Sequence, residues 1–476
     1  MNATKLNNEK VKYSIVSLTW PIFVEVLLQN TLCISATFML SYYSEKAAPG
    51  VGISGSIVYL LILLFGILNS GNVVLISQYI GAKKKDMAIG VANISLVGNF
   101  LFGVILSVVI IVFRKHILNI INVPYELYDY TIKYISIVGG GIFVQAVFNS
   151  LCSTVRAFGY TKVTMTVGVL VNVFNIISNY LIIFKGINIY TNNVITGVAF
   201  SNVFSQVIGF LLLFSIANKS LNIKFSLERL RKIPKKIVGD ILKIGIPAAS
   251  ESISYQISQL VILSMIMSMG VVETSIRTYV FNLMWIIEIF AFSIGIGSEI
   301  LIGNMVGAGR LEEAKKSCIK SLKVGVSVSF ALTVVFKIFS NRLLAMFTHD
   351  SYIISVGGTL LGIAILLQPG KAMNMVLINS LRGSGDVKYP VYMSMASVWG
   401  VSTVLSHILG IRLELGLIGI FIALILDEWT RAFILLKRWK SGAWKGKTLV
   451  SVKKEIPGAS SCGIPAYIEK GVEVTL

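Results

Sequence analysis

Apolar stretches of membrane-spanning length recur along almost the whole chain. A helix needs about 20 apolar residues to cross a bilayer, and stretches of that order are separated by short polar connections. Strands of a membrane barrel would alternate in polarity over about ten residues, and these stretches do not. The pattern therefore predicts an all-α integral membrane protein with twelve transmembrane helices. The expected spans are residues 14–41, 51–80, 88–113, 131–155, 163–184, 194–217, 241–269, 278–306, 317–340, 351–380, 389–411 and 413–436.

The two halves of the chain repeat one another without a gap. A shift of 226 positions superposes proline, glutamate, glycine, arginine and lysine residues in one register, which two merely apolar sequences would not share by chance. Each half holds six spans, so both halves have the same orientation in the bilayer. The repeat predicts two pseudo-symmetric six-helix bundles. The superposed residues include Pro21 and Pro247, Glu25 and Glu251, Gly71 and Gly297, Gly81 and Gly307, Arg156 and Arg382, and Lys162 and Lys388.

The repeat and the polar segments around it divide the chain into five parts. The segment "LERLRKIPKKIVGD" is rich in basic residues and joins the two halves. The end of the chain is expected to be a tail of low order without chemistry. The predicted parts are 1–13 as a cytoplasmic N-terminus, 14–217 as an N-lobe with helices 1–6, 218–240 as a cytoplasmic basic linker, 241–437 as a C-lobe with helices 7–12, and 438–476 as a cytoplasmic tail.

The charge of the chain follows its predicted topology. The sequence is 55% hydrophobic and 13% charged, with mean hydropathy +0.79 and a net charge of +20. On the side that holds both ends and the even-numbered connections we count 31 lysines and arginines, against 9 on the other side. This asymmetry is the positive-inside pattern. It predicts a multi-pass protein of the cell membrane with both termini in the cytoplasm, whose basic surface faces anionic lipid and not a nucleic acid.

Paired motifs in the two halves resemble those of a known family. "LISQYIGAKKKDMA" (75–88) and "LIGNMVGAGRLEEA" (301–314) are similar to the motifs that follow helices 2 and 8 of the multidrug and toxic compound extrusion (MATE) transporters. "VRAFGYTKVTM" (155–165), "LRGSGDVKYPV" (381–391) and "LDEWTRAFILLKRW" (426–439) resemble further motifs of that family, and the resemblance covers about residues 14–440. It implies two lobes that export organic cations in exchange for inward-moving Na⁺ or H⁺. Residues in these motifs are expected to act at a cytoplasmic gate: Gly81, Gly307, Arg156, Arg382 and Asp386.

Four ionisable residues fall near the middle of predicted spans. Charged groups in the hydrocarbon are costly and usually functional. Each lies eleven residues from a charged or polar residue at one end of its span, which at 1.5 Å per residue places it about 16 Å deep. The sequence predicts that they share one level and a polar cleft where an ion or substrate binds. They are Glu25, Glu251, Glu288 and Lys371.

Glu25 and Glu251 each follow a proline by four residues. Pro21 and Pro247 lack the backbone N–H that a helix needs, so each frees a carbonyl one turn earlier and bends the helix. The residue four positions on lies on the same face. A bent helix is therefore expected to present each carboxylate, together with a spare carbonyl, to an ion such as Na⁺. The alternative is that the prolines only serve packing and that the carboxylates are structural.

Lys371 admits two interpretations. It is either half of a buried ion pair with Glu251 or Glu288, or it competes with substrate or proton for Glu251 during transport. Asp427 and Arg431 stand four residues apart, which favours a local ion pair near the cytoplasmic end of the last span.

The sequence departs from the resembled family at the positions of its ion ligands. Counted from Gln29, the helix-1 aspartate of one branch falls on Ala36, and its helix-5 aspartate is replaced by Asn179. Asn172 and Asn175 keep a polar face there, and the helix-7 glutamate of the other branch falls on Tyr255. These residues are included in the candidate site, and the choice between H⁺ and Na⁺ stays open.

These features predict an ion-coupled antiporter for small organic cations, without a cofactor or a resident metal and without an enzyme's chemistry. No GxxxxGK[ST] phosphate loop occurs in the sequence, which argues against ATP as the energy source. A monomer is expected. Three alternatives stay open: a flippase for lipid-linked oligosaccharide from the same superfamily, a membrane-embedded lipid enzyme, and a transporter of the major facilitator type.

Overall fold

The computed structural model describes residues 14–186, 193–223, 225 and 235–450, and within them the protein is built from helices. The first bundle, the N-lobe, contains seven of them, of which the first begins at a capping box made by Ser14 and Ser17. The predicted N-terminus 1–13 and residues 224 and 226–234 of the basic linker lie outside the described residues. The N-lobe helices are α1 (Ile15–Tyr43), α2 (Ala47–Gly81), α3 (Lys85–Ile120), α4 (Tyr125–Gly140), α5 (Ile142–Ala157), α6 (Thr161–Phe184) and α7 (Val194–Lys219).

The second bundle, the C-lobe, repeats the first. The last residues of α1 and α2, Tyr43 and Gly81, correspond under the shift of 226 positions to Met269 and Gly307. These are the last residues of the first two helices of the C-lobe. The predicted duplication is thus a duplication of structure, and the all-α fold with two bundles is confirmed. The C-lobe helices are α9 (Lys235–Met269), α10 (Val271–Gly307), α11 (Leu311–Ile338), α12 (Ser340–Ala345), α13 (Ser351–Ser384), α14 (Lys388–Ser397) and α15 (Gly416–Ser441), with two π-helical stretches, η1 (Val398–Thr403) and η2 (Ser406–Arg412), between the last two.

Two predicted spans differ in kind from the rest. The span expected at 131–155 is a pair of helices, α4 and α5, which meet at Gly141 with a bend of 49°. Ten described helices are long and apolar enough to cross a membrane, or eleven spans when the bent pair counts as one. The remaining long helix, α15, has 26 residues but carries Asp427, Glu428 and Arg431 in its interior. Its charges therefore need partners inside the lobe.

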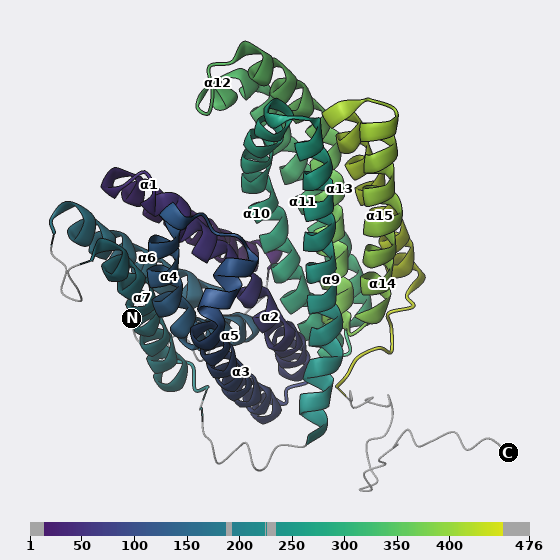
Figure 1. The fold of residues 1–476 in the computed structure, drawn as a ribbon. Coiled ribbons are helices and arrows are strands. Elements are labelled where there is room, and N and C mark those ends of the chain that lie inside the picture. Colours follow the sequence, from purple (N-terminus) through teal and green to yellow (C-terminus); the bar gives the residue numbers. More distant parts are fainter. Residues whose placement is uncertain (1–13, 187–192, 224, 226–234, 451–476) are drawn as a thin grey trace, which may run out of the picture.

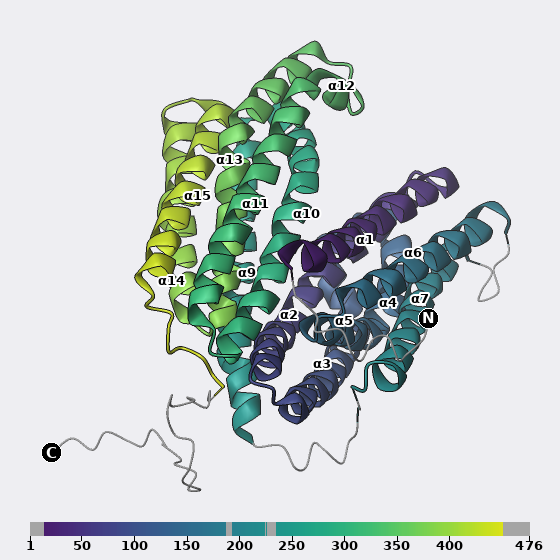
Figure 2. The ribbon, with the colours of Figure 1, turned by 180° about the vertical axis from the view of Figure 1, so that it is seen from behind.

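The lobes meet at one end and splay apart towards the other. In both views the bundles lie together at α2 and α9 and diverge towards α12 and the far end of α1 (Figures 1 and 2). At the junction, a Cβ on Gly81 would overlap the Asn304 carbonyl, and one on Gly307 would overlap the Gln78 carbonyl. The two contacts are equivalent under the 226-residue shift. Only glycine permits this close approach of α2 and α10.

The segment after α15 is packed and not the tail of low order that composition suggested. Trp444 is fully buried and stacks on Trp439, with ring centroids 4.4 Å apart and planes at 7°. The Thr448 hydroxyl and the Leu449 N–H both donate to the Gln78 side-chain oxygen at 3.1 Å. Gln78 belongs to α2, so residues 442–450 tie the C-lobe to the N-lobe at their junction. Residues 451–476 lie outside the described residues.

Candidate functional site

Glu25 is held by an arginine from the loop motif of its own lobe. Its Oε1 lies 3.1 Å from Arg156 Nη1 at the end of α5, and its Oε2 accepts a hydrogen bond from the Thr164 hydroxyl of α6 at 3.0 Å. The carboxylate is 2% exposed. Both oxygens therefore have a partner, and the charge of Glu25 is compensated inside the N-lobe.

Glu251 repeats this arrangement in the C-lobe. Arg382, near the end of α13, places Nη2 3.3 Å from Glu251 Oε2. Glu251 follows Glu25, and Arg382 follows Arg156, by the same 226 positions. Lys371 lies eleven residues before Arg382 on α13, or about 16 Å along the helix. Glu251 is therefore paired with Arg382 and not with Lys371, the other base considered for it.

The prolines do not interrupt their helices. Pro21 lies inside α1 and Pro247 inside α9, and each helix runs through its proline. Pro21 cannot donate to the Ser17 carbonyl, and that carbonyl accepts the Thr161 hydroxyl from α6 at 3.4 Å. The carbonyl freed in the N-lobe thus has a protein partner and is not presented as a free ligand for an ion.

Lys371 pairs with Glu288, one of the two partners considered for it. Its Nζ lies 2.7 Å from Glu288 Oε1, and the Gln368 side-chain amide donates to the same oxygen at 3.3 Å. The ammonium also stands 5.9 Å from the centroid of the Tyr255 ring. A carboxylate and an aromatic ring are the two protein groups that most favour a cation in a dry site.

A second ion-pair group lies on α15. Arg431 donates to Asp427 Oδ2 and approaches Glu428 Oε1, both at 2.8 Å. Asn374 of α13 donates to Glu428 Oε2 at 2.6 Å, and the Ser397 hydroxyl donates to Asp427 Oδ1 at 2.6 Å. The local pair predicted for Asp427 and Arg431 is confirmed. Glu428 was missed, although its spacing of three residues from Arg431 in "DEWTR" was a signal for it.

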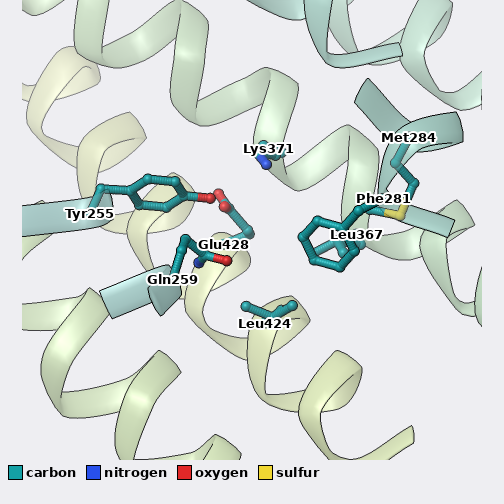
Figure 3. A pocket seen from close by; sticks show the side chains of 8 residues that line it. All are labelled: Tyr255, Gln259, Phe281, Met284, Leu367, Lys371, Leu424 and Glu428. Atoms are coloured by element: carbon teal, nitrogen blue, oxygen red, sulfur yellow. The ribbon is translucent and has the colours of Figure 1, made fainter. Parts of the chain in front are cut away.

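The two groups meet at a small pocket inside the C-lobe. Tyr255 and Gln259 enter it from one side, Phe281, Met284 and Leu367 from the other, and Lys371 lies between them (Figure 3). Leu424 and Glu428 of α15 complete the wall. Around this pocket three carboxylates (Glu288, Asp427 and Glu428) surround two bases (Lys371 and Arg431). A third base, Arg277, stacks on the Phe281 ring of the pocket wall, 4.2 Å from its centroid, so three acids face three bases around the pocket.

The remaining candidates lie outside this pocket. Asn172, Asn175 and Asn179 are buried in the N-lobe, where Asn175 donates to the Ser205 hydroxyl at 3.1 Å and Asn179 donates to Asn175 Oδ1 at 2.9 Å. Gln29 is exposed on α1. Asp386 is buried and pairs with Arg438 of α15 at 2.9 Å.

Within the described parts of the chain, no three histidine, cysteine, aspartate or glutamate side chains come together as a metal site. The described charges inside the N-lobe belong mainly to the Glu25 pair, whereas the C-lobe holds the larger ionic network. The two lobes are therefore alike in fold and unlike in charge.

Comparison with known proteins agrees with this architecture. A solved structure of MATE in a bent conformation superposes with a TM-score of 0.84 over 94% of this chain and 98% of its own, at 19% identity. An outward-facing conformation of a multidrug resistance MATE family transporter of the MOP superfamily gives a TM-score of 0.83 over 90% and 96%, at 18% identity. At these identities the likeness concerns the fold.

Sequence comparison extends the likeness to the family. The uncharacterized transporter YisQ of Bacillus subtilis (strain 168) is 36% identical, over 91% of this chain and 95% of its own. The probable multidrug resistance protein NorM of Thermotoga maritima is 24% identical, over 93% and 95%. The MatE family model matches residues 21–181 and 247–408, one segment in each lobe. The chain belongs to the MatE family, whose members are membrane transporters and not enzymes.

Proposed function

We propose that this protein exports small organic cations in exchange for inward-moving H⁺ or Na⁺, by alternating access of its two lobes. The observation that carries the proposal is the C-lobe group of three carboxylates and two bases beside a pocket with aromatic walls. A buried carboxylate of this group can be neutralised by one cation at a time. An organic cation and a small ion therefore exclude each other, which is the requirement for exchange.

The pocket suits a cation with an apolar body. The Tyr255 ring offers a face for a positive charge, and Met284 is a flexible, polarisable side chain that adapts to different shapes. Relatives bearing the name of multidrug resistance proteins support the same substrate class. Among the alternatives, a flippase for pyrophosphate-linked sugars would need an excess of bases, and here three bases face three acids.

The paired carboxylates have a different role in this proposal. Glu25 and Glu251 were the first candidates for ion coupling, and both are compensated by arginines. We propose that they hold Arg156 and Arg382 in place near the junction of the lobes, and that the coupling ion binds at Glu288, Asp427 and Glu428. No bound metal is needed for this scheme, since H⁺ serves as well as Na⁺.

The orientation and the oligomeric state are proposals of the same kind. The 31-to-9 distribution of basic residues supports a cytoplasmic position for both termini and for the linker. The junction of the lobes then lies on the cytoplasmic side, and the splayed ends face outwards. One chain forms the whole pocket, so a monomer suffices for transport.

The experiment separates the two ions. Purified protein is reconstituted into vesicles loaded with ethidium, and either a Na⁺ gradient or a pH gradient, directed inwards, is imposed by itself. One of the two gradients is expected to accelerate ethidium efflux. Glu428→Gln is expected to abolish that acceleration, whereas Glu414→Gln, at an exposed position outside the helices, is expected to leave it unchanged. Efflux that responds to neither gradient would contradict the proposal.

A further inference from the structure

Lys371 occupies the place in the pocket that suits the charged end of an organic cation. Its ammonium sits between the Glu288 carboxylate at 2.7 Å and the face of the Tyr255 ring, whose centroid is 5.9 Å away. A free alkylammonium or quaternary cation would be attracted by the same two groups. The Lys371 ammonium, attached to the backbone by four carbons, therefore resembles the charged group of the proposed substrate.

We propose that Lys371 is a tethered competitor: its ammonium fills the cation site formed by Glu288 and Tyr255, and an arriving organic cation displaces it. The inference rests on the proposed function in taking organic cations as the substrate class. It adds the site for the substrate's charge and the residue that sets its affinity. It also explains why a protein that would bind cations places a fixed positive charge in the pocket.

The free space beside the ammonium is small, so an organic cation would fit only where the Lys371 side chain withdraws. Phe281, Met284 and Leu367 form an apolar wall opposite Tyr255 (Figure 3). Gln368 is fully buried, and its side-chain oxygen has no hydrogen-bond partner in the part of the chain that the structure describes. An apolar wall and a buried acceptor beside a carboxylate are features that also suit an ammonium with organic substituents.

The displaced ammonium has a second carboxylate within reach. Glu428 lines the same pocket as Lys371 and interacts electrostatically with it. Lysine is a point charge on a flexible stem, so it can change partners by rotation of its side chain. In that state the substrate neutralises Glu288 while Lys371 moves to Glu428, which Asn374 and Arg431 already hold. No buried carboxylate is left without a cation.

Removal of the tether is the direct test. Binding of tetraphenylphosphonium to the purified full chain is measured for wild type, Lys371→Met and Lys371→Arg. Lys371→Met is expected to lower the dissociation constant at least tenfold, because the competitor is gone while Glu288 remains. Lys371→Arg keeps a competitor and is expected to stay within about threefold of wild type. Equal or weaker binding by Lys371→Met would overturn the inference.

A double variant and a stability measurement cover the case of a damaged fold. Lys371→Met/Glu288→Gln lacks both charges and is expected to lose the gain in affinity. Because a ligand stabilises the state that binds it, tetraphenylphosphonium should raise the melting temperature of Lys371→Met more than that of wild type. If Lys371→Met cannot be recovered even in the presence of the cation, a free cation does not replace the ammonium and the inference fails.

A chemical version of the test restores the charge. In a chain whose own cysteines are replaced, Lys371→Cys is treated with a trimethylammonium-ethyl methanethiosulfonate or with the neutral methyl methanethiosulfonate. The cationic adduct is expected to return tetraphenylphosphonium binding to about the wild-type level, and the neutral adduct is expected to leave it tight. Equal effects of the two adducts would indicate simple obstruction and would overturn the inference.

The outcome is separable from that of the proposed function. Tighter binding by Lys371→Met together with a wild type that responds to no ion gradient would retain the cation site and reject ion-coupled export. If an ion gradient drives export by the wild type and Lys371→Met does not bind more tightly, ion-coupled export is retained and the role of Lys371 as a competitor is rejected.

Discussion

Arg156 Nη1 lies 3.1 Å from Glu25 Oε1, although 131 residues separate the two in the sequence. The same separation joins Arg382 to Glu251 in the other lobe. A duplication that preserves an ion pair in both copies preserves both partners together, because each buried glutamate would lose the arginine that compensates it. The arginines of the paired loop motifs thus anchor the first helix of each lobe.

Loss of one partner of this pair is expected to destabilise the N-lobe strongly. Glu25→Gln leaves the Arg156 guanidinium poorly compensated in a buried site, and breaking a buried pair costs about 3–5 kcal/mol. Glu25→Gln/Arg156→Gln removes both charges and should recover part of this loss. The measurement is thermal unfolding in detergent. If the double variant loses as much stability as the two single variants together, the two charges do not act as a pair.

The close approach of α2 and α10 predicts an effect of a single methyl group. Gly81→Ala places a Cβ against the Asn304 carbonyl, so the lobes must separate where they now meet. A clash of about 1.4 kcal/mol shifts such an equilibrium tenfold. Spin labels at position 85, which begins α3, and at position 316, in the second turn of α11, should report a longer distance. Gly66→Ala on α2, where a Cβ meets open space, should leave the distance unchanged, and equal distances in both variants would argue against glycine packing as the hinge contact.

The sequence predicted the fold more completely than it predicted the contacts of the candidate site. One shift of 226 positions aligned Pro21 with Pro247 and Glu25 with Glu251, and the helices obey the same shift. The ion-pair partners of the buried carboxylates are not contained in the spacing of charged residues along one helix. Arginine has a long stem that lets its charge reach back along a helix, so Arg382 pairs with a carboxylate that was expected beside Lys371.

The missed residues share one cause. Glu428 lies in a charged stretch near the end of the last predicted span, but α15 continues to Ser441 and the Glu428 side chain is buried. Trp444 followed the last apolar stretch and was assigned to a tail by composition alone. In both cases the deciding contacts, to Asn374 and to Trp439, come from tertiary packing. Hydrophobic periodicity does not contain that information.

Trp444 is expected to hold the segment after α15 in place. Trp444→Ala removes a fully buried aromatic ring, and such truncations cost about 3–5 kcal/mol. The segment 442–450 should then be released from Gln78, so trypsin should cleave after Lys445 or Lys447 faster than in wild type. Thr448→Ala, which removes only a hydroxyl bonded to Gln78, serves as the mild control. Identical cleavage rates in wild type and Trp444→Ala would show that the stack does not secure the segment.

Arg431 is expected to be the least replaceable residue of the C-lobe network. It compensates both Asp427 and Glu428, so Arg431→Met leaves two adjacent buried carboxylates without their base. The loss of stability should reach about 3–5 kcal/mol, seen as a lower melting temperature and a lower yield from the membrane. The exposed Arg412→Met is the matched control and should behave as wild type.

The same network predicts which second change repairs the first. Arg431→Met combined with Asp427→Asn and Glu428→Gln removes all three charges at nearly constant volume, and neutral replacement of a buried ionic group is often tolerated. The triple variant should therefore melt well above Arg431→Met while losing ion-driven transport, since Glu428 is part of the proposed coupling site. A triple variant no more stable than Arg431→Met would mean that Arg431 stabilises the lobe through packing of its stem, and the charge balance drawn around the pocket would have to be abandoned.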